Sequence, residues 1–221
     1  MKSKENAYTM KIASWNVNSL NVRLPQVLDW LSSHEPDVLC LQETKLEDAR
    51  FPLAEIGAVG YRALFSGQKA YNGVAILSRV AGNDAVTALP GFADEQKRVL
   101  AATFGDVRVI NLYVPNGQSV DSEKYRYQLD WLAALTVWLK AELARYPKLA
   151  VLGDFNIAPD DRDVYDPKAW EGQILCSEPE RQAFRRLLAL GLKDAFRLFE
   201  QPEKSFSWWD YRMNGFRRNL G

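Results

Sequence analysis

The chain has 221 residues, of which 47% are hydrophobic and 25% are charged, and its 28 basic and 28 acidic side chains give a formal net charge of zero. These proportions are typical of a globular protein with room for a sizeable buried core. The zero net charge argues against strong non-specific binding of nucleic acid but allows a local basic face. Because no stretch of about 18 apolar residues occurs, we expect no membrane span and a cytoplasmic protein.

The two cysteines and the start of the chain say little about function. Cys40 lies in the apolar run of residues 38–41, which predicts a buried thiol, and Cys176 is far from it in the sequence. Two cysteines without metal-ligand spacing give no support for a zinc site and indicate a reducing compartment only weakly. Residues 1–10 are polar, lack the apolar core of a signal peptide and are expected to form a flexible leader.

The chain then opens with a β-α-β pattern. Residues 11–17 read as a strand, and residues 23–34 carry apolar side chains at helical spacing, with Pro25 placed in the first turn of the predicted helix. Pro36 ends this helix, and the apolar run of residues 37–41 predicts a buried strand.

The middle of the chain is predicted to be strand-rich. Residues 73–78, 99–104 and 107–114 are strand candidates, and Gly105-Asp106 between the last two is a two-residue hairpin signal. The sequence therefore predicts adjacent antiparallel strands here.

A long helix follows over residues 121–146. One stripe of this helix is expected to face the core: Leu129, Leu132, Thr136, Leu139 and Leu143. A buried strand is predicted over residues 149–152 and a second helix over 180–190, closed by Gly191. With no repeat, low-complexity tract or linker, the pattern favours one mixed-sheet α/β domain over residues 11–221.

Polar side chains follow three of the predicted strands. Asn16, Glu43 and Asp154 lie at these strand ends, with Asn156 two residues beyond Asp154. Functional sites of open α/β sheets often lie at such an edge. Mg²⁺ prefers hard oxygen ligands and usually takes one or two carboxylates, which this set supplies. A phosphodiester site also needs few bare carboxylates facing the anion, and an asparagine donates hydrogen bonds without adding charge.

Each of these residues also has an ordinary structural interpretation. Asp or Asn after a strand is usually a turn residue, and Glu43 with Thr44 and Lys45 could belong to a solvated loop. The three occurrences together, all at strand ends, favour a site.

Seven segments resemble the exonuclease III family, within the wider endonuclease/exonuclease/phosphatase fold, and they occur in the family's order. They are WNVN (15–18), LQETK (41–45), GQK (67–69), GVA (73–75), VINLYVP (109–115), GDFNI (153–157) and FSWWDYR (206–212). LQET and GDFN are moderately specific singly, the ordered set is highly specific, and SWWDYR is similar to the bacterial DNA-repair branch.

The resemblance implies a four-layer α/β sandwich with two packed mixed β-sheets flanked by helices. It implies a Mg²⁺-dependent hydrolase, with Mn²⁺ as a possible substitute, that cleaves DNA 5′ to abasic sites and trims 3′ ends as a 3′-5′ exonuclease and 3′ phosphodiesterase. The expected partner is duplex DNA with abasic sites or blocked 3′ ends, bound by a monomer.

The resemblance also assigns roles at the site. Glu43 would be the principal metal ligand, and Asn16 a second ligand or a phosphate contact. Asp154 would activate or orient the attacking water, or protonate the leaving oxygen. Asn156 and the phenol of Tyr113 would hydrogen-bond the phosphate.

A DNA-binding surface is implied around the last aromatic motif. Trp208 and Phe206 would form the wall of a pocket for a flipped abasic sugar, although their alternation is also typical of a strand with one buried face. Lys69 and Arg98 are candidate phosphate contacts, with solvated strand edges as the alternative. Arg212, followed by two further arginines, gives the local basic stretch expected of a DNA face.

The sequence departs from the family's pattern at its end. Family members continue with a strand carrying Arg-Ile-Asp and a Ser-Asp-His segment, whereas this sequence stops at Gly221, and its only histidine, His34, is expected at the surface end of a helix. The chain is therefore expected to be either a fragment of a longer enzyme, which we favour, or a truncated form that binds damaged DNA with impaired catalysis. A third interpretation is a phosphatase of the same fold acting on inositol phosphates or RNA ends, which SWWDYR argues against.

Overall fold

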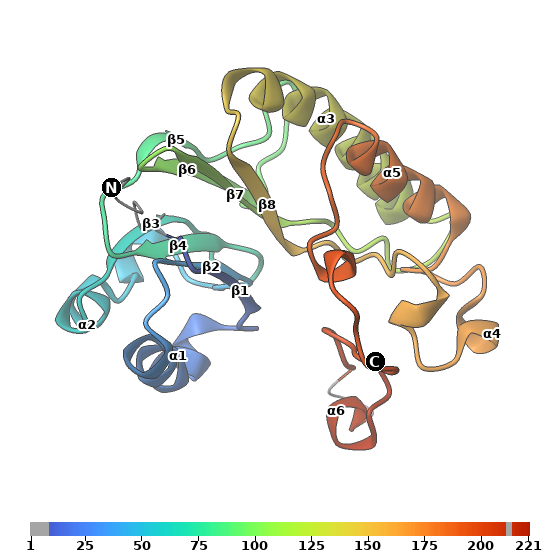
Figure 1. The fold of residues 1–221 in the computed structure, drawn as a ribbon, viewed down its shortest axis with the longest axis horizontal. Coiled ribbons are helices and arrows are strands. Elements are labelled where there is room, and N and C mark those ends of the chain that lie inside the picture. The colour runs from blue at the N-terminus through green and yellow to red at the C-terminus, as the bar shows by residue number, and fades with distance from the viewer. Residues whose placement is uncertain (1–8, 211–213) are drawn as a thin grey trace, which may run out of the picture. The chain divides into compact units, whose positions relative to one another are not determined.

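The computed structural model describes residues 9–210 and 214–221 and divides the chain into two compact units. The first unit is formed by the chain up to Leu89 together with Ala93–Tyr113 and Tyr146–Asp154, and the second by Pro90–Phe92, Val114–Arg145 and Phe155–Gly221. Figure 1 shows the elements of each. The single domain expected over residues 11–221 stays a prediction.

The first sheet of the first unit contains β1 (Ile12–Asn16), β2 (Val38–Gln42), β3 (Arg62–Ser66) and β4 (Val74–Ser78) in the order β1-β2-β4-β3. β1 and β2 are parallel, whereas β4 runs antiparallel to both of its neighbours. The sheet is therefore mixed, with its parallel pair at one side.

The second sheet repeats this arrangement. It contains β5 (Asn83–Val86), β6 (Val99–Phe104), β7 (Val107–Tyr113) and β8 (Leu149–Asp154), in that order. β7 and β8 are parallel, and the other pairs are antiparallel. The predicted Gly105-Asp106 hairpin turn is confirmed, with Gly105 at a φ of 61° that suits glycine.

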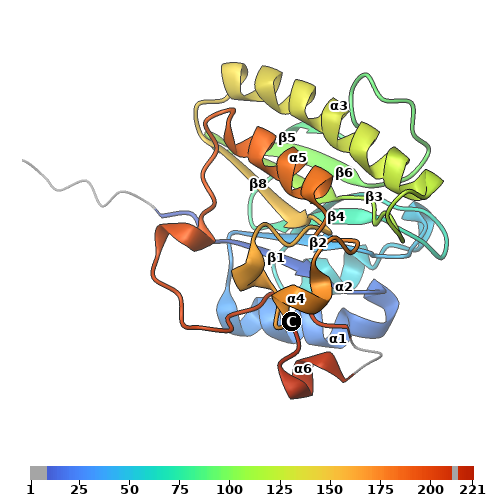
Figure 2. The ribbon, with the colours of Figure 1, turned by 90° about the vertical axis from the view of Figure 1, so that its right-hand side faces the viewer.

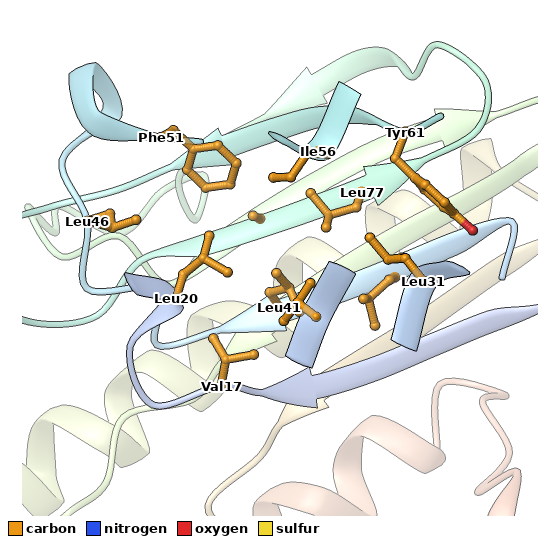
Figure 3. Packing of buried hydrophobic residues seen from close by; sticks show 12 residues of the cluster. Val17, Leu20, Leu31, Leu41, Leu46, Phe51, Ile56, Tyr61 and Leu77 are labelled. Carbon is orange, nitrogen blue, oxygen red and sulfur yellow. The ribbon is translucent and has the colours of Figure 1, made fainter. Parts of the chain in front are cut away.

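Two apolar clusters explain why β2 reads as a continuous apolar run. Leu39 and Leu41 of β2 face a cluster formed with α1 (Leu20–His34) and α2 (Leu53–Ala58), shown in Figure 3. Val38 and Cys40 point the opposite way, into a cluster shared with β6 and β7 of the second sheet. Because both faces of β2 are covered, all five of its residues are buried, as predicted for this strand and for the Cys40 thiol.

The second unit is mainly helical. α3 (Glu123–Arg145) contacts α5 (Glu178–Leu188), and the two helices run side by side in Figure 2. Ser177 caps α5 in a capping box with Glu180, and its hydroxyl also hydrogen-bonds that of Tyr125 on α3 at 2.7 Å.

Shorter helices complete the described chain. They are α4 (Pro167–Trp170), α6 (Gly215–Arg218) and the 3-10 helices Asp48–Arg50, Asp161–Asp163 and Phe196–Leu198. In the part of the chain that the structure describes, no helix combines the length and apolarity needed to cross a bilayer.

The first helix differs from the prediction in where it begins. α1 begins at Leu20 rather than at residue 23, so the placement of Pro25 in the first turn was wrong, and this proline lies in the second turn. The helix begins early because the backbone N–H groups of Ser19 and Leu20 donate to the carbonyls of Glu43 and Thr44. The chain after β1 is thus held against the end of β2.

The buried face of α3 is also shifted from the predicted stripe. Leu132 and Leu139 are buried, but the other three predicted positions are only partly covered. Burial instead centres on Trp131, Leu135 and Trp138, because the two indoles have the most apolar area to remove from water.

The predicted fold class is confirmed: the chain is an α/β protein with two mixed sheets and flanking helices. The elements that were not predicted include the short helices α2, α4 and α6 and the strands β3 and β5. Both missed strands lie at sheet edges, where pairing with a neighbour compensates for a weak apolar pattern.

Candidate active site

Four strand ends of the first unit supply the candidate site. Asn16 ends β1, Glu43 follows the last residue of β2, Tyr113 ends β7 and Asp154 ends β8. These are the parallel pairs of the two sheets, so their carboxyl ends point to one edge of each sheet.

Asn16 joins the two acids. Its Nδ2 donates to Glu43 Oε1 at 2.8 Å and to Asp154 Oδ2 at 2.8 Å, and its Oδ1 accepts from the backbone N–H of Asn18 at 3.0 Å. One amide group therefore holds an oxygen of each carboxylate within two hydrogen-bond lengths of the other. The structure thus brings together the three residues on which the predicted site depends.

Lys45 supplies a positive charge beside Glu43. Its Nζ lies 2.9 Å from Glu43 Oε2 and also donates to the side-chain oxygen of Asn18. Burial alone would raise the pKa of Glu43, but hydrogen bonds from Asn16, Lys45 and Tyr113, together with the charge of Lys45, outweigh it and lower the pKa. Glu43 is therefore a carboxylate at neutral pH.

Tyr113 is held between Glu43 and Arg98. The Arg98 guanidinium lies 4.7 Å from the centre of the Tyr113 ring and donates to the Tyr113 carbonyl at 3.1 Å. Burial, and then the negative charge of Glu43, raises the pKa of the phenol above its usual value, although Arg98 acts in the opposite direction. The hydroxyl consequently remains a hydrogen-bond donor across the physiological pH range.

The backbone around Glu43 adopts left-handed conformations. Glu43 has a φ of 54° and Lys45 a φ of 53°, which are uncommon for residues other than glycine. This turn directs both side chains toward Asn16 and Asn18 while Thr44 stays buried. Non-glycine residues held in sparsely populated regions cluster at functional sites.

Gly153 is required where β8 meets β7. Its φ is 135°, and a Cβ at this position would lie 1.9 Å from the carbonyl oxygen of Leu112. The glycine therefore allows β8 to approach β7 closely just before Asp154.

Lys69 and Arg98, two predicted phosphate contacts of the first unit, differ in their exposure to solvent. Lys69 is exposed on the loop between β3 and β4. Arg98 is only 9% exposed, and its guanidinium also donates twice to Gln96 Oε1. In this arrangement Arg98 orients Tyr113, and its predicted contact with a phosphate stays a prediction.

The remaining predicted residues belong to the second unit or lie outside the described residues. Asn156 donates to the carbonyl of Val114 at 2.9 Å and accepts from Asn116 at 3.1 Å. Phe206 is partly buried against Gly221, where an added Cβ would lie 2.2 Å from the ring, whereas Trp208 is 40% exposed.

Arg212 lies outside the described residues. The alternative interpretation of Phe206 and Trp208 as parts of a strand is wrong, because residues 199–210 form no strand.

Sequence reasoning gave no role to Lys45, Gln42 or Asn111. All three stand inside segments of the predicted resemblance, and all three contact or support the site: Lys45 pairs with Glu43, and Gln42 Nε2 donates to Asn111 Oδ1 at 2.7 Å. The signal that could have found Gln42 and Asn111 is a polar amide inside an otherwise apolar strand.

The donor chemistry of the site fits a hard divalent cation. Within residues 9–210 and 214–221 no group of three or more His, Cys, Asp or Glu side chains could hold a metal ion. Mg²⁺, however, needs only one or two carboxylates and keeps several waters. Glu43 and Asp154, linked through Asn16, supply such a pair.

Two sheets that bring a pair of carboxylates together at their strand ends form an arrangement typical of hydrolytic enzymes. The model of the Endonuclease/Exonuclease/phosphatase family matches residues 13–221. Exodeoxyribonuclease III of Haemophilus influenzae is 35% identical over 96% of this chain and 84% of its own length. The chain belongs to this family, and the predicted resemblance to exonuclease III is confirmed.

Solved structures of nucleases are also similar to this chain. The 3′ phosphatase NExo from Neisseria, bound to product DNA hairpin, is 50% identical with a TM-score of 0.93, covering 96% of this chain and 83% of that one. An AP endonuclease from Archaeoglobus fulgidus is 38% identical with a TM-score of 0.91 over the same shares. The chain is accordingly a hydrolytic nuclease of the exodeoxyribonuclease III type.

Proposed function

We propose that the chain is a Mg²⁺-dependent DNA-repair phosphodiesterase that processes blocked 3′ ends and cleaves duplex DNA 5′ to abasic sites, with Mn²⁺ able to replace Mg²⁺. The single observation that carries the proposal is the amide of Asn16, which joins Glu43 and Asp154 at 2.8 Å each. It creates the compact, half-buried acidic pair that phosphodiester hydrolysis with a divalent cation requires.

Glu43 is the proposed metal ligand. Glu43 is ionised at neutral pH, and its lowered pKa keeps it ionised in more acidic solution as well. A bound cation would therefore meet the full negative charge of the carboxylate. A bound Mg²⁺ would supply neutralisation of the charge that develops on the phosphate. Asn16, predicted as a second ligand or phosphate contact, has its carbonyl oxygen engaged by Asn18, and we assign it the orientation of both carboxylates.

Asp154 is the proposed proton acceptor for the attacking water, or the donor to the leaving oxygen. It stands beside Glu43 on the other sheet, so the water and the phosphate can be approached from two strands. Tyr113, whose raised pKa keeps its hydroxyl protonated, donates a hydrogen bond to a phosphate oxygen without adding negative charge.

The proposed DNA contacts are the residues of the predicted surface. Asn156 donates a hydrogen bond to the phosphate at the site, and Lys69 contacts a phosphate of the DNA backbone from its exposed loop. Trp208, with 40% of its surface accessible, is available to stack on or enclose a sugar, and Phe206 is the second residue of the proposed pocket wall.

The comparisons favour 3′-end processing as the leading activity. The relative named as a 3′ phosphatase is 50% identical to this chain, whereas the relative named as an AP endonuclease is 38% identical. Both activities break a phosphate ester next to a deoxyribose. They differ in what lies on the 3′ side of the bond, so one acidic site can serve both with different rates.

Two matched duplexes test the proposal. One carries a nick ending in a 3′ phosphate, and the other an internal abasic analogue, both with the same label and flanking sequence. We expect Mg²⁺-dependent product from both duplexes, faster from the 3′ phosphate, and none in EDTA.

Each contrary outcome is specific. Full activity in EDTA would refute the metal-dependent mechanism, and tight binding of both duplexes without product would favour the form that only binds damaged DNA. Turnover confined to inositol phosphates or RNA ends would favour the phosphatase alternative.

A further inference from the structure

Two buried amides lie directly beneath the candidate site. Gln42 is the last residue of β2, Asn111 lies two residues before the end of β7, and the two are 1% and 0% exposed. Gln42 Nε2 donates to Asn111 Oδ1 at 2.7 Å, and this bond joins the first sheet to the second. The cluster of buried side chains that packs between the sheets is apolar, so a buried polar link beside it calls for a physical reason.

Asn111 also binds two strands of the opposite sheet. Its Nδ2 donates to the carbonyl of Leu41 on β2 and to that of Ala75 on β4, at 2.9 Å each, and these two residues are paired in the sheet register. One accepted and two donated bonds fix the side chain in all directions. Asn111 therefore sets how the end of β7 lies against β2 and β4.

The hydrogen-bond network continues to β1, and on each strand its residue precedes the site residue by one or two positions. Gln42 Nε2 also donates to Ser14 Oγ of β1 at 3.1 Å. Ser14 precedes Asn16 by two residues, and Asn111 precedes Tyr113 by two, so each pair shares one face of its strand. Gln42 itself is followed directly by Glu43.

We propose that Gln42 and Asn111 are positioning residues, whose bond sets the place of Tyr113 relative to Asn16 and Glu43 and thereby the metal affinity and turnover of the site. The inference rests on the proposed function. Replacing both partners of a buried hydrogen bond by apolar groups of similar shape is often nearly neutral for stability, whereas a misplacement of about 1 Å at a reacting centre can cost about 100-fold in rate. The pair thus acts on geometry more than on folding.

The test compares Asn111→Leu, Gln42→Met and the double variant with a control, Val109→Ala. Val109 lies on the same strand and face as Asn111 but two residues farther from the site, and it packs in the apolar cluster between the sheets. The measurements are the Tm, the Mg²⁺ concentration that half-maximally raises the Tm, and kcat and KM on the 3′-phosphate duplex.

We expect the single variants to lower kcat about 10- to 100-fold, with KM within about threefold, and to raise the Mg²⁺ midpoint. Their losses should not add in the double variant, because each removes the same bond. Val109→Ala should also lower the Tm, because it leaves a cavity in the apolar cluster, while kcat and the Mg²⁺ midpoint of the folded protein stay unchanged. If Asn111→Leu does not fold, Gln42→Met, which keeps both carbonyl bonds of Asn111, carries the test.

Unchanged kcat and Mg²⁺ midpoint in the folded variants would overturn the inference, and so would a control that loses as much turnover as they do. A wild-type chain that Mg²⁺ stabilises but that cleaves neither duplex would overturn the proposed function alone. The Mg²⁺ midpoints of the Tm shift, compared between wild type and the variants, would then test the positioning role of Gln42 and Asn111. A chain that Mg²⁺ neither stabilises nor activates would overturn both.

Discussion

Asn16 and Asp154 are 138 positions apart in the sequence, yet the amide nitrogen of Asn16 lies 2.8 Å from a carboxylate oxygen of Asp154. This contact joins β1 of one sheet to β8 of the other. The candidate site is therefore assembled where two sheets meet, and its acids can be tested one sheet at a time.

Glu43→Gln tests the acid of the first sheet. Removing the charge should weaken Mg²⁺ binding at least about tenfold and lower the cleavage rate at least about 100-fold, because the proposed ligand becomes a neutral amide of the same size. Mg²⁺ titrations of Tm and of cleavage rate measure both effects. Glu47→Gln, which removes the same charge from an exposed loop nearby, should change neither; an unaltered titration for Glu43→Gln would remove this residue from the ligand set.

Asp154→Asn tests the acid of the second sheet. Turnover should fall about 100-fold or more, because an amide cannot accept the proton of the attacking water, whereas the Mg²⁺ midpoint should change less than in Glu43→Gln. Single-turnover rates at saturating Mg²⁺ separate these effects. The control is Asp106→Asn, in an exposed hairpin turn, and near-normal turnover of Asp154→Asn would contradict the assigned role.

Tyr113→Phe tests the phenol between the sheets. We expect about a tenfold to 100-fold loss of kcat from the missing donor. The pKa of Tyr113 is raised, by burial first and then by the charge of Glu43. The wild-type rate should therefore show no loss from phenol ionisation as the pH rises through about 10, the usual tyrosine value. Tyr71→Phe, on an exposed tyrosine, is the control, and a wild-type alkaline limb that Tyr113→Phe abolishes would contradict the raised pKa.

Much of this site could be predicted from the sequence because it depends on strand ends. Polar residues directly after buried apolar runs placed Asn16, Glu43 and Asp154 at sheet edges. The ordered motifs then identified the family. Residues in the middle of the two-sided strand β2 read as apolar because both of their faces are covered.

What the sequence could not predict is set by backbone conformation and packing. Lys45 reaches Glu43 because positive φ angles at both residues turn the chain back, and no propensity rule assigns such angles to Glu or Lys. Arg98 lies over the Tyr113 ring, a contact that its position before a strand does not reveal. The short edge strand β5 carries almost no apolar pattern and owes its conformation to pairing with β6.

Trp208→Ala tests the proposed DNA surface of the second unit. Because this indole is 40% exposed, its removal should change Tm little, but it should weaken binding of an abasic or 3′-blocked duplex by about 1 to 3 kcal/mol if a sugar or base stacks on it. Fluorescence anisotropy at fixed salt measures the change. Phe199→Ala, on another exposed aromatic residue, is the control, and equal affinities for wild type and Trp208→Ala would exclude the indole from the interface.

Lys45→Met tests the charge that holds Glu43. The folded-state pKa of Glu43 is lowered, because hydrogen bonds from Asn16, Lys45 and Tyr113 and the Lys45 charge outweigh a burial effect that is the largest single cause and acts to raise it. Stability from this ionised form is present above the unfolded glutamate pKa, and it is lost as the pH falls through the lower folded value. Removing Lys45 should raise the Glu43 pKa, measured by carboxyl carbon-13 shifts of the metal-free protein.

The same substitution should reduce the free energy of unfolding by about 1 kcal/mol at neutral pH, since both partners are partly exposed, and by less as the pH falls below the folded pKa of Glu43. Lys193→Met, at an exposed position of the second unit, is the matched control and should shift neither quantity. A Glu43 pKa that stays the same or falls in Lys45→Met would show that Asn16 and Tyr113 alone keep this carboxylate ionised.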